Sequence, residues 1–511
     1  MTLNVIVQAG GRGSRLRHHT WNKPKCLVSV HGKPLLYHLF DKFSDARFII
    51  IGDYLYEQLE NYLQVDSPNV EYKLIRANEK GTCAGIAQAL DAVPKDEPVL
   101  LTWSDLIINH IAPFPDNADR PIVCLTDAFT CRWSMQPHGL EESPGETNGV
   151  PGIFYFPTRE HFPKPPLSGE FVKWFSNNVS DFDTVTEHQL EELGDFRAIE
   201  ANNSKLGFCR FFNNVDVQDD VVVKQAIDSN YAHLITQEHA WYSAINDLGF
   251  KRIPSVGLDS QHLTMSKVRG QHVWEIQDLT AREQRSMLAD IIYTLQDLHS
   301  KGQQPANNDQ IKHVYIEKTQ NRVNSVSKII PGFDKASFTV NGVKCINIFH
   351  STHSQLWSQI DDALQATWFT PIHGDPTFSN TIIDNNLKAW FIDPRGYFDE
   401  PGIFGDPVYD FAKVYYSAIG GYDNFNRRKF KLHIDEDTCE IIMPVAPTAE
   451  IAENVFEELL PEYMSKIELL HGLIWLALSG YAKDDIDSVI GSFYYGLYWL
   501  NKGLAKHNDT I

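Results

Sequence analysis

Short apolar runs alternate with stretches of helical periodicity along the first 110 residues of the chain. The runs at 5–8, 48–51 and 99–103 are each typical of a strand that is buried on both faces. Between them, apolar residues recur at helical spacing from Leu35 to Phe43, and residues 85–92 also favour a helix. Strands separated by helices predict a parallel sheet with helices on its faces.

The pattern changes around residues 205–220. A strand at 221–224 ends in Lys224, and a helix is expected to follow through Glu238. Residues 282–299 have the periodicity of an amphipathic helix, and the runs at 381–383 and 390–392 flank a hairpin turn. The sequence after about residue 405 favours helices and is rich in aromatic residues. The change predicts two domains, 1–205 and 206–511.

Composition and charge exclude several classes of protein. A chain of 511 residues suggests two to four domains at roughly 150 residues each. Lys and Arg number 45 and Asp and Glu 66, so the formal charge of −21 argues against a non-specific nucleic-acid binder or a basic membrane-surface protein. The seven cysteines form no CxxC pair, which favours reduced thiols over disulfides or a zinc site.

The N-terminal sequence and the lengths of the apolar runs give an expectation for localisation. The N-terminus passes from Met1 directly into a strand-like run, without the basic and apolar regions of a signal peptide. The longest apolar runs, such as residues 473–478, fall far short of the ~20 residues that a membrane span needs. We expect a cytoplasmic protein with no membrane insertion and no nucleic-acid partner.

The first chemical motif is a glycine-rich segment that directly follows the first predicted strand. Glycines allow the backbone to approach a ligand closely, and successive N–H groups form a site for an anion. Arg15 within the segment and Lys25, in the Pro24-Lys25 pair that starts nine residues beyond it, would neutralise a triphosphate. The candidate catalytic cations are therefore Arg15 and Lys25, and the candidate nucleotide-binding residues of the loop are Gln8, Ala9, Gly10, Gly11, Gly13 and Ser14.

This loop and the Pro24-Lys25 pair resemble the signature of the sugar-nucleotide and phosphocholine nucleotidyltransferases. The resemblance covers about residues 3–205 and implies a Rossmann-like domain with a mixed sheet and helices on both faces. It implies that Gly81 and Thr82 belong to the loop that contacts the nucleobase. Asp105 would be a ligand of Mg²⁺, although Ser104 stands where the family has glycine. Glu200, with Asp195 behind it, is the candidate for the second metal carboxylate.

The second motif is His373-Gly374-Asp375, with an Asn five residues later and Asp393 after a further apolar run. Asp375 can accept the proton of an attacking hydroxyl, and Asn380 and Asp393 can hold Mg²⁺ on ATP phosphates. The motif resembles the aminoglycoside phosphotransferase and choline kinase superfamily, which has a bilobal, protein-kinase-like fold.

The resemblance to these kinases covers about residues 206–511, with an N-lobe at about 206–268 and a C-lobe at about 269–511. It implies that Lys224 pairs with ATP and with Glu238. Residues 263–270, including Met265 and Lys267, would link the lobes beside ATP. Only residues 206–214 are available before Lys224 to form the hairpin that covers the ATP phosphates in these kinases, and they contain a single glycine, Gly207.

We therefore expect a bifunctional enzyme with Mg²⁺ at both sites. The kinase would phosphorylate a small hydroxyl-bearing metabolite with ATP, and the N-terminal domain would then join that phosphate to an NMP unit. Our leading expectation is CTP with a small alcohol, choline or ethanolamine first, giving a CDP-alcohol for bacterial surface polysaccharide or lipid. The aromatic residues after Trp475 could cage a quaternary amine, but at helical spacing such residues are more often core.

Two alternatives stay open. The chain could be an anomeric sugar kinase fused to a sugar-1-phosphate uridylyl- or guanylyltransferase that makes an NDP-sugar. One domain could instead be an inactive, ligand-sensing module, or the chain a scaffold. The retained Lys25, Asp105, Asp375, Asn380 and Asp393 argue against loss of activity.

Overall fold

The computed structural model describes residues 2–77, 79–115, 117–204, 213–227, 232–259 and 262–510. The chain divides into two compact units, one formed by Met1–Lys205 with Asp484–Asp487 and the other by Leu206–Lys483 with Ser488–Ile511. The predicted hairpin at 206–214 lies almost entirely outside the described residues.

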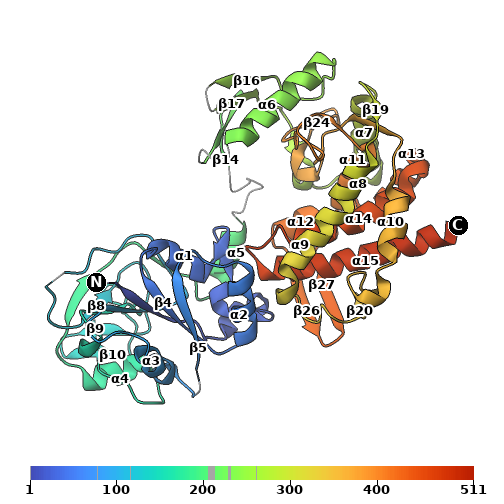
Figure 1. Cartoon of the computed structure of the whole chain (residues 1–511). Coiled ribbons are helices and arrows are strands. Elements are labelled where there is room, and N and C mark those ends of the chain that lie inside the picture. Colours follow the sequence, from blue (N-terminus) through green and yellow to red (C-terminus); the bar gives the residue numbers. More distant parts are fainter. Residues whose placement is uncertain are drawn as a thin grey trace. The chain divides into compact units, whose positions relative to one another are not determined.

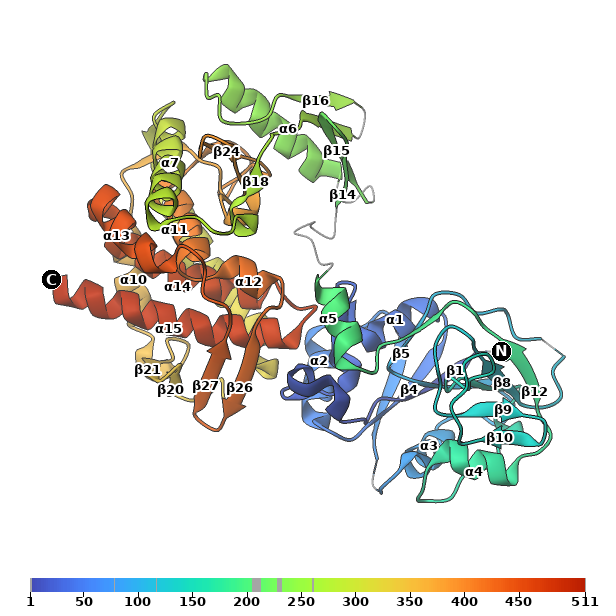
Figure 2. The same cartoon turned by 180° about the vertical axis from the view of Figure 1, so that it is seen from behind.

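A seven-stranded sheet forms the centre of the first unit (Figures 1 and 2). Its strands are, in spatial order, β12 (Asp183–Thr186), β8 (Ile122–Leu125), β11 (Phe154–Phe156), β6 (Val99–Trp103), β1 (Asn4–Gln8), β4 (Arg47–Gly52) and β5 (Glu71–Arg76). β11 runs antiparallel to β6 and β8, while β1, β4, β5 and β6 are parallel, so the sheet is mixed.

Helices and three short strand pairs surround this sheet. The helices are α1 (Leu35–Lys42), α2 (Tyr56–Val65), α3 (Thr82–Leu90), α4 (Phe171–Asn178) and α5 (Phe196–Ser204). The strand pairs are β2 (Ser29–Val30) with β3 (Lys33–Pro34), β9 (Ser134–Gln136) with β10 (Gly139–Glu141), and β7 (Leu106–Ile108) with β13 (Leu190–Glu192).

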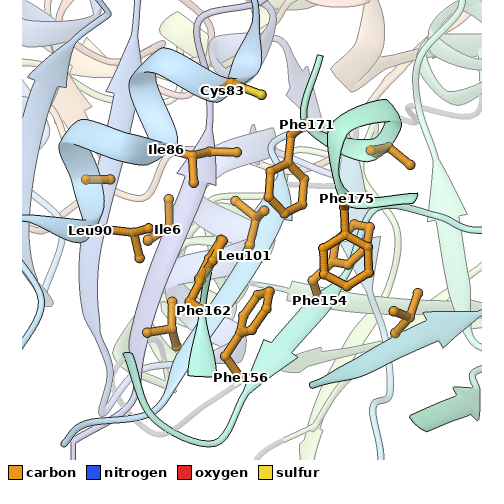
Figure 3. Close-up of a cluster of buried hydrophobic side chains, with 14 of the residues drawn as sticks. Ile6, Cys83, Ile86, Leu90, Leu101, Phe154, Phe156, Phe162, Phe171 and Phe175 are labelled. Carbon is orange, nitrogen blue, oxygen red and sulfur yellow. The ribbon is translucent and has the colours of Figure 1, made fainter. Parts of the chain in front are cut away.

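The core of the first unit lies between the sheet and helices α3 and α4. Figure 3 shows Ile86 and Leu90 of α3 and Phe171 and Phe175 of α4 directed toward side chains of the strands. Burying each phenylalanine contributes roughly 1.5–3 kcal/mol, so this layer fixes where both helices begin. The other labelled members of the cluster are Ile6, Cys83, Leu101, Phe154, Phe156 and Phe162.

The register of the central strands decides where the first site forms. Gln8, the last residue of β1, lies opposite Ile51 of β4 and Trp103 of β6. Because these strands are parallel, the segments that follow them emerge at the same edge of the sheet. The glycine loop after β1 and Asp105 after β6 therefore lie side by side.

The second unit begins with an antiparallel four-stranded sheet and one helix (Figure 2). Its strands are, in spatial order, β14 (Asn213–Val217), β15 (Val221–Ala226), β17 (His262–Ser266) and β16 (Val256–Asp259), and α6 (Ala232–Asp247) packs on β15, β16 and β17. Among the described residues, the hairpin that carries Lys224 is thus β14–β15, with its turn at 218–220.

The remainder of the second unit is mainly helical. Its helices are α7 (Ala281–His299), α8 (Asn308–Lys312), α9 (Lys318–Val326), α10 (Leu356–Leu364), α11 (Pro407–Ala418), α12 (Tyr422–Asn426), α13 (Ala449–Leu459), α14 (Met464–Ser479) and α15 (Ile486–Thr510). α14 packs against both α9 and α11, and α7 packs against α13. Thr280 caps α7 by accepting a hydrogen bond from the Glu283 amide.

Ten short strands complete the second unit. They are β18 (Gln271–His272), β23 (Thr381–Ile383) and β24 (Ala389–Phe391) in one sheet, β19 (Gln304–Pro305), β22 (Trp368–Pro371) and β25 (Phe404–Gly405) in a second, and β20 (Ser337–Val340), β21 (Val343–Ile346), β26 (Lys431–Asp435) and β27 (Thr438–Ile442) in a third. The β26–β27 hairpin departs from the expected helical content after residue 405. Buried Leu432 and Ile441 alternate with exposed neighbours there, as in a strand with one covered face.

Candidate active sites

The glycine loop of the first unit holds a lysine close to its backbone. Gly13 has a φ of 63°, and a Cβ at this position would lie 3.0 Å from the Cβ of Lys25. The lysine stem therefore crosses the loop where only glycine leaves room. The Lys25 ammonium pairs with the carboxylate of Asp105, so the structure brings these two predicted residues together.

A second carboxylate, Glu192 at the end of β13, lies beside Asp105. β13 pairs with β7 so that Glu192 stands opposite Leu106, and the Leu193 amide donates to the Asp105 carbonyl oxygen at 3.0 Å. Burial raises the pKa of Glu192, and the negative charge of Asp105 adds to the rise, while Arg15 and Lys25 oppose it. Arg15 approaches Glu192 at 3.6 Å between Nη2 and Oε1. Two carboxylates and two cations thus share one site.

Glu200, the predicted second metal carboxylate, lies with His18 and His19 in a group whose possible ligand atoms are all within 4.8 Å of one another. It lies on α5, where its Oε1 is 2.8 Å from Nε2 of His19. The carboxylate that the structure places beside Asp105 is Glu192. Residues 191, 192 and 195 are all acidic, and only the pairing of β13 with β7 singles out Glu192.

The predicted nucleobase loop meets the start of α4. Gly81 has a φ of 94°, and a Cβ there would lie 2.3 Å from the carbonyl oxygen of Gly169. Thr82 Oγ1 accepts a hydrogen bond from the Phe171 amide at 2.8 Å, and the Thr82 carbonyl accepts one from Gln8 Nε2 at 3.0 Å. These contacts place residues 8, 81 and 82 next to one another, on one side of the predicted nucleotide site.

The lysine–glutamate pair of the second unit is buried. Lys224 Nζ lies 2.7 Å from Glu238 Oε2 and 2.6 Å from Asp393 Oδ1, and the lysine is 4% exposed. Burial alone would lower the pKa of Lys224, but the charges of Asp393 and Glu238 raise it above its ordinary value. The lysine therefore stays charged and is aimed at the carboxylate predicted to hold metal.

Asp375 and Asn380 form the centre of the second site. Asn380 Nδ2 donates to the Asp375 carbonyl oxygen at 2.8 Å and to its Oδ2 at 3.1 Å. Lys413 of α11 lies 3.0 Å from Asp375 Oδ1, a contact that the sequence did not indicate. The structure thus brings Asp375 and Asn380 together and adds a cation to them.

A buried carboxylate, Asp410, holds the loop that carries Asp375. Its oxygens accept hydrogen bonds from the amides of His373 and Gly374 at 2.8 and 2.7 Å, and His299 Nε2 lies 3.0 Å away. His373 Nε2 is 2.9 Å from the Ile392 carbonyl oxygen, which ties this loop to the segment that carries Asp393. Asp410 thus fixes the backbone of the loop from which Asp375 projects.

The remaining predicted residues are Met265, Lys267 and the aromatic residues late in the chain. Met265 is buried in β17, and Lys267 Nζ donates to the Gln218 carbonyl oxygen at 3.0 Å, which ties it to the β14–β15 turn. The late aromatic residues are largely core: those that are buried are Trp475, Phe493, Tyr494 and Tyr495. Lys502 already lies over the rings of Tyr498 and Trp499, so these residues do not form an open cage for an amine.

Two family models match this chain. Residues 5–128 match the MobA-like NTP transferase domain, and residues 199–433 match the phosphotransferase enzyme family. The chain therefore joins a segment similar to the nucleotidyltransferases to a segment similar to the phosphotransferases. The predicted fold class and the predicted resemblance to these two families are confirmed. None of the described helices has the length and apolar character to span a membrane.

Curated relatives resemble the nucleotidyltransferase domain. The bifunctional protein GlmU of Chromohalobacter salexigens is 35% identical over 109 residues, which are 21% of this chain and 22% of the relative. The UTP–glucose-1-phosphate uridylyltransferase AglF of Haloferax volcanii is 32% identical over 112 residues, 21% of this chain and 45% of the relative. The chain therefore spans between about a fifth and a half of the length of these relatives.

Solved structures resemble each domain. The CTP:phosphocholine cytidylyltransferase of Streptococcus pneumoniae is 20% identical with a TM-score of 0.32, covering 39% of this chain and 97% of that one. The gentamicin–APH(2")-IIa complex is 16% identical with a TM-score of 0.37, covering 56% of this chain and 87% of that one.

Proposed function

We propose that the chain makes an activated donor in two steps. The phosphotransferase domain transfers phosphate from ATP to a hydroxyl of a small alcohol or sugar. The nucleotidyltransferase domain then joins that phosphate to an NMP unit and releases pyrophosphate. The observation that carries this proposal is that each unit brings charged and polar groups together. In one unit, Lys25 and Arg15 lie beside Asp105 and Glu192. In the other, Lys224 pairs with Asp393, Asn380 donates to Asp375, and the Ile392 amide before Asp393 donates to the Asn380 carbonyl oxygen.

In the kinase step, Asp375 orients the acceptor hydroxyl and takes its proton as the oxygen attacks the γ-phosphorus. Asn380 holds the carboxylate of Asp375 in place through its amide nitrogen. Lys224 is held by Glu238 and would bind the ATP phosphates as a fixed positive charge.

In the nucleotidyl step, a phosphate monoester attacks the α-phosphorus of the NTP. Both reactants are anions, so the loop that carries Lys25 and Arg15 offsets their repulsion and stabilises the charge that moves to pyrophosphate. Gln8 and the loop at Gly81–Thr82 would hold the nucleoside. No covalent intermediate is required.

A divalent metal fits both sites. The pKa of Glu192 is raised partly by Asp105, a crowding of two carboxylates that a bound cation would relieve. Oxygen ligands suit hard cations, so we propose Mg²⁺ at Asp105 and Glu192 and at Asn380 and Asp393. When bound, the metal neutralises charge on the transferring phosphate.

For the nucleotide and product, we propose CTP and a CDP-alcohol type donor for bacterial surface polysaccharide or lipid, made in the cytoplasm. The sequence Leu-Ser-Gly-Glu-Phe-Val at 167–172 resembles a segment of the short CTP:phosphocholine cytidylyltransferases. Gly169 within it lies against Gly81, which favours this choice. The alternative is a sugar kinase joined to a uridylyl- or guanylyltransferase, which the sugar-phosphate relatives favour.

Two matched variants test the proposal. Asp375→Asn should lower ATP-dependent phosphorylation by about 100-fold or more, while pre-phosphorylated acceptor is still converted by the N-terminal site. Lys25→Ala should do the reverse. The exposed Asp362 and Lys33 provide controls as Asp362→Asn and Lys33→Ala. Loss of both activities in folded Asp375→Asn protein would contradict the two-site proposal.

A further inference from the structure

A cluster of cations lies beside Asp375, and the proposed transfer of phosphate from ATP does not use most of it. Arg395 follows Asp393 by two residues, and its stem passes over the Asp375 loop. A Cβ on Gly374, whose φ is 82°, would lie 2.8 Å from the Arg395 Cβ. The guanidinium donates to Tyr409 Oη at 3.1 Å and lies 4.3 Å from the centre of the Tyr397 ring.

Two further cations come from α9, far from the kinase motif in sequence. Lys318 Nζ lies 5.9 Å from the centre of the Tyr397 ring, the same ring that Arg395 contacts. Arg322 follows four residues later, so both side chains project from the same face of α9. Like charges at this spacing destabilise a helix by a few tenths of a kcal/mol. The pairing within α9 therefore does not stabilise the helix, although Arg322 also lies 5.9 Å from the centre of the Tyr481 ring.

The positive charge of the cluster acts on its own members. Burial lowers the pKa of Lys318, and the positive charges of Arg395 and Arg322 lower it further. Burial would raise the pKa of the Tyr397 phenol, but Arg395, Lys318 and Arg322 together lower it below its ordinary value. Both shifts have the sign expected beside excess positive charge.

Neighbouring carboxylates balance this charge only in part, since the charge of Asp375 raises the pKa of Arg395. Asp375 pairs with Lys413, and Asp399, which faces Lys318, lies 2.7 Å from Nδ1 of His313. Within the described part of the chain, Arg395, Lys318 and Arg322 make no ion pair with a carboxylate. Half-buried cations are normally paired, so the three cations form a place where an anion from outside the chain would be stabilised.

We propose that Arg395, Lys318 and Arg322 bind a negatively charged group, a carboxylate or a phosphate, on the alcohol that Asp375 deprotonates. The inference rests on the proposed kinase function. It revises the expectation of choline or ethanolamine, because an ammonium group would meet like charges. The overall charge of −21 does not offset this local field, since charges separated by more than about 8 Å are largely screened at physiological salt.

The test is a matched panel of acceptors, read as ADP release and as heat of binding with a non-hydrolysable ATP analogue. Each set holds an alcohol, its acid and its phosphate ester: glycerol, glycerate and glycerol phosphate; a hexose, its uronic acid and its phosphate. Choline and ethanolamine complete the panel. We expect an acid or a phosphate ester to bind and turn over while its neutral parent does not. Phosphorylation of a neutral or cationic member in preference to the anions would overturn the inference and leave the kinase in place.

Variants locate the anion. Lys318→Met and Arg322→Met should each raise the KM of the acceptor about tenfold or more, with the KM of ATP unchanged. Lys344→Met, an exposed lysine on β21, is the control. A rise in the KM of ATP instead would assign the cluster to the nucleotide and overturn the inference. An anion could bind to the unaltered protein and not to Lys318→Met, while no acceptor gives ADP release. That result would contradict the proposed kinase activity and support the anion site. Absence of binding by every anion would overturn the inference.

Discussion

Asp423 on α12 gives a prediction about stability and pH. Its side chain is buried, at 6% exposure, close enough to Asp375 to feel its charge. Neither carboxylate oxygen has a hydrogen-bond partner of normal geometry among the described residues, although the Ser417 hydroxyl and the Ser379 amide favour the ionised form. Burial outweighs them and raises the pKa of Asp423 from 3.8 to about 7.

The direction and size of the effect follow from linkage. Below pH 3.8 the carboxyl is protonated in both folded and unfolded chains, and between pH 3.8 and about 7 only the folded chain keeps the proton. Folding stability contributed by this group is therefore lost as pH rises through that range. A pKa difference of about three corresponds to about 4 kcal/mol. Asp423→Asn removes the ionisation and should remove this loss.

The assay is urea unfolding at pH 5 and pH 8, followed by hydrogen exchange of peptides from α11 and α14, which reports this unit alone. The advantage of Asp423→Asn in free energy of unfolding should grow by about 3 kcal/mol between the two pH values. Asp435→Asn, at an exposed carboxylate on β26, is the control. An advantage that is the same at both pH values would refute the reasoning.

Three further predictions concern the nucleotidyltransferase domain and the metals. Glu192→Gln should lower nucleotidyl transfer at least about tenfold, while Glu191→Gln beside it stays within about twofold; equal losses would remove Glu192 from the site. Gly81→Ala should raise the KM of the NTP, because a Cβ would collide with Gly169, whereas Gly257→Ala, with open space around it, should not; an unchanged KM would argue against this loop as the nucleobase wall. EDTA should abolish both activities and Mg²⁺ or Mn²⁺ restore them, and full turnover in EDTA would contradict the proposed metals.

The sequence by itself indicated two families in one chain and predicted residues for a site in each of them. The glycine loop and Asp105 were predicted because each follows a strand, and Lys25 because it belongs to the Pro-Lys pair that follows the loop in the sequence. Parallel strands then bring the ends of β1 and β6 to one edge, as the alternation of strands and helices implied. The pairs within the His373–Asp393 segment are likewise close in sequence.

Only the tertiary structure decided which residues from distant parts of the sequence lie at the two candidate sites. Glu192 stands beside Asp105 because β13 pairs with β7, and the acidic residues around it have no local pattern that separates them from Glu200. Lys318 of α9 reaches Tyr397, which lies in the segment between β24 and β25, far from α9 in the sequence. Helix packing and strand pairing depend on the whole buried surface, so local patterns do not indicate such neighbours. The charge around Asp375 is therefore a property of the fold.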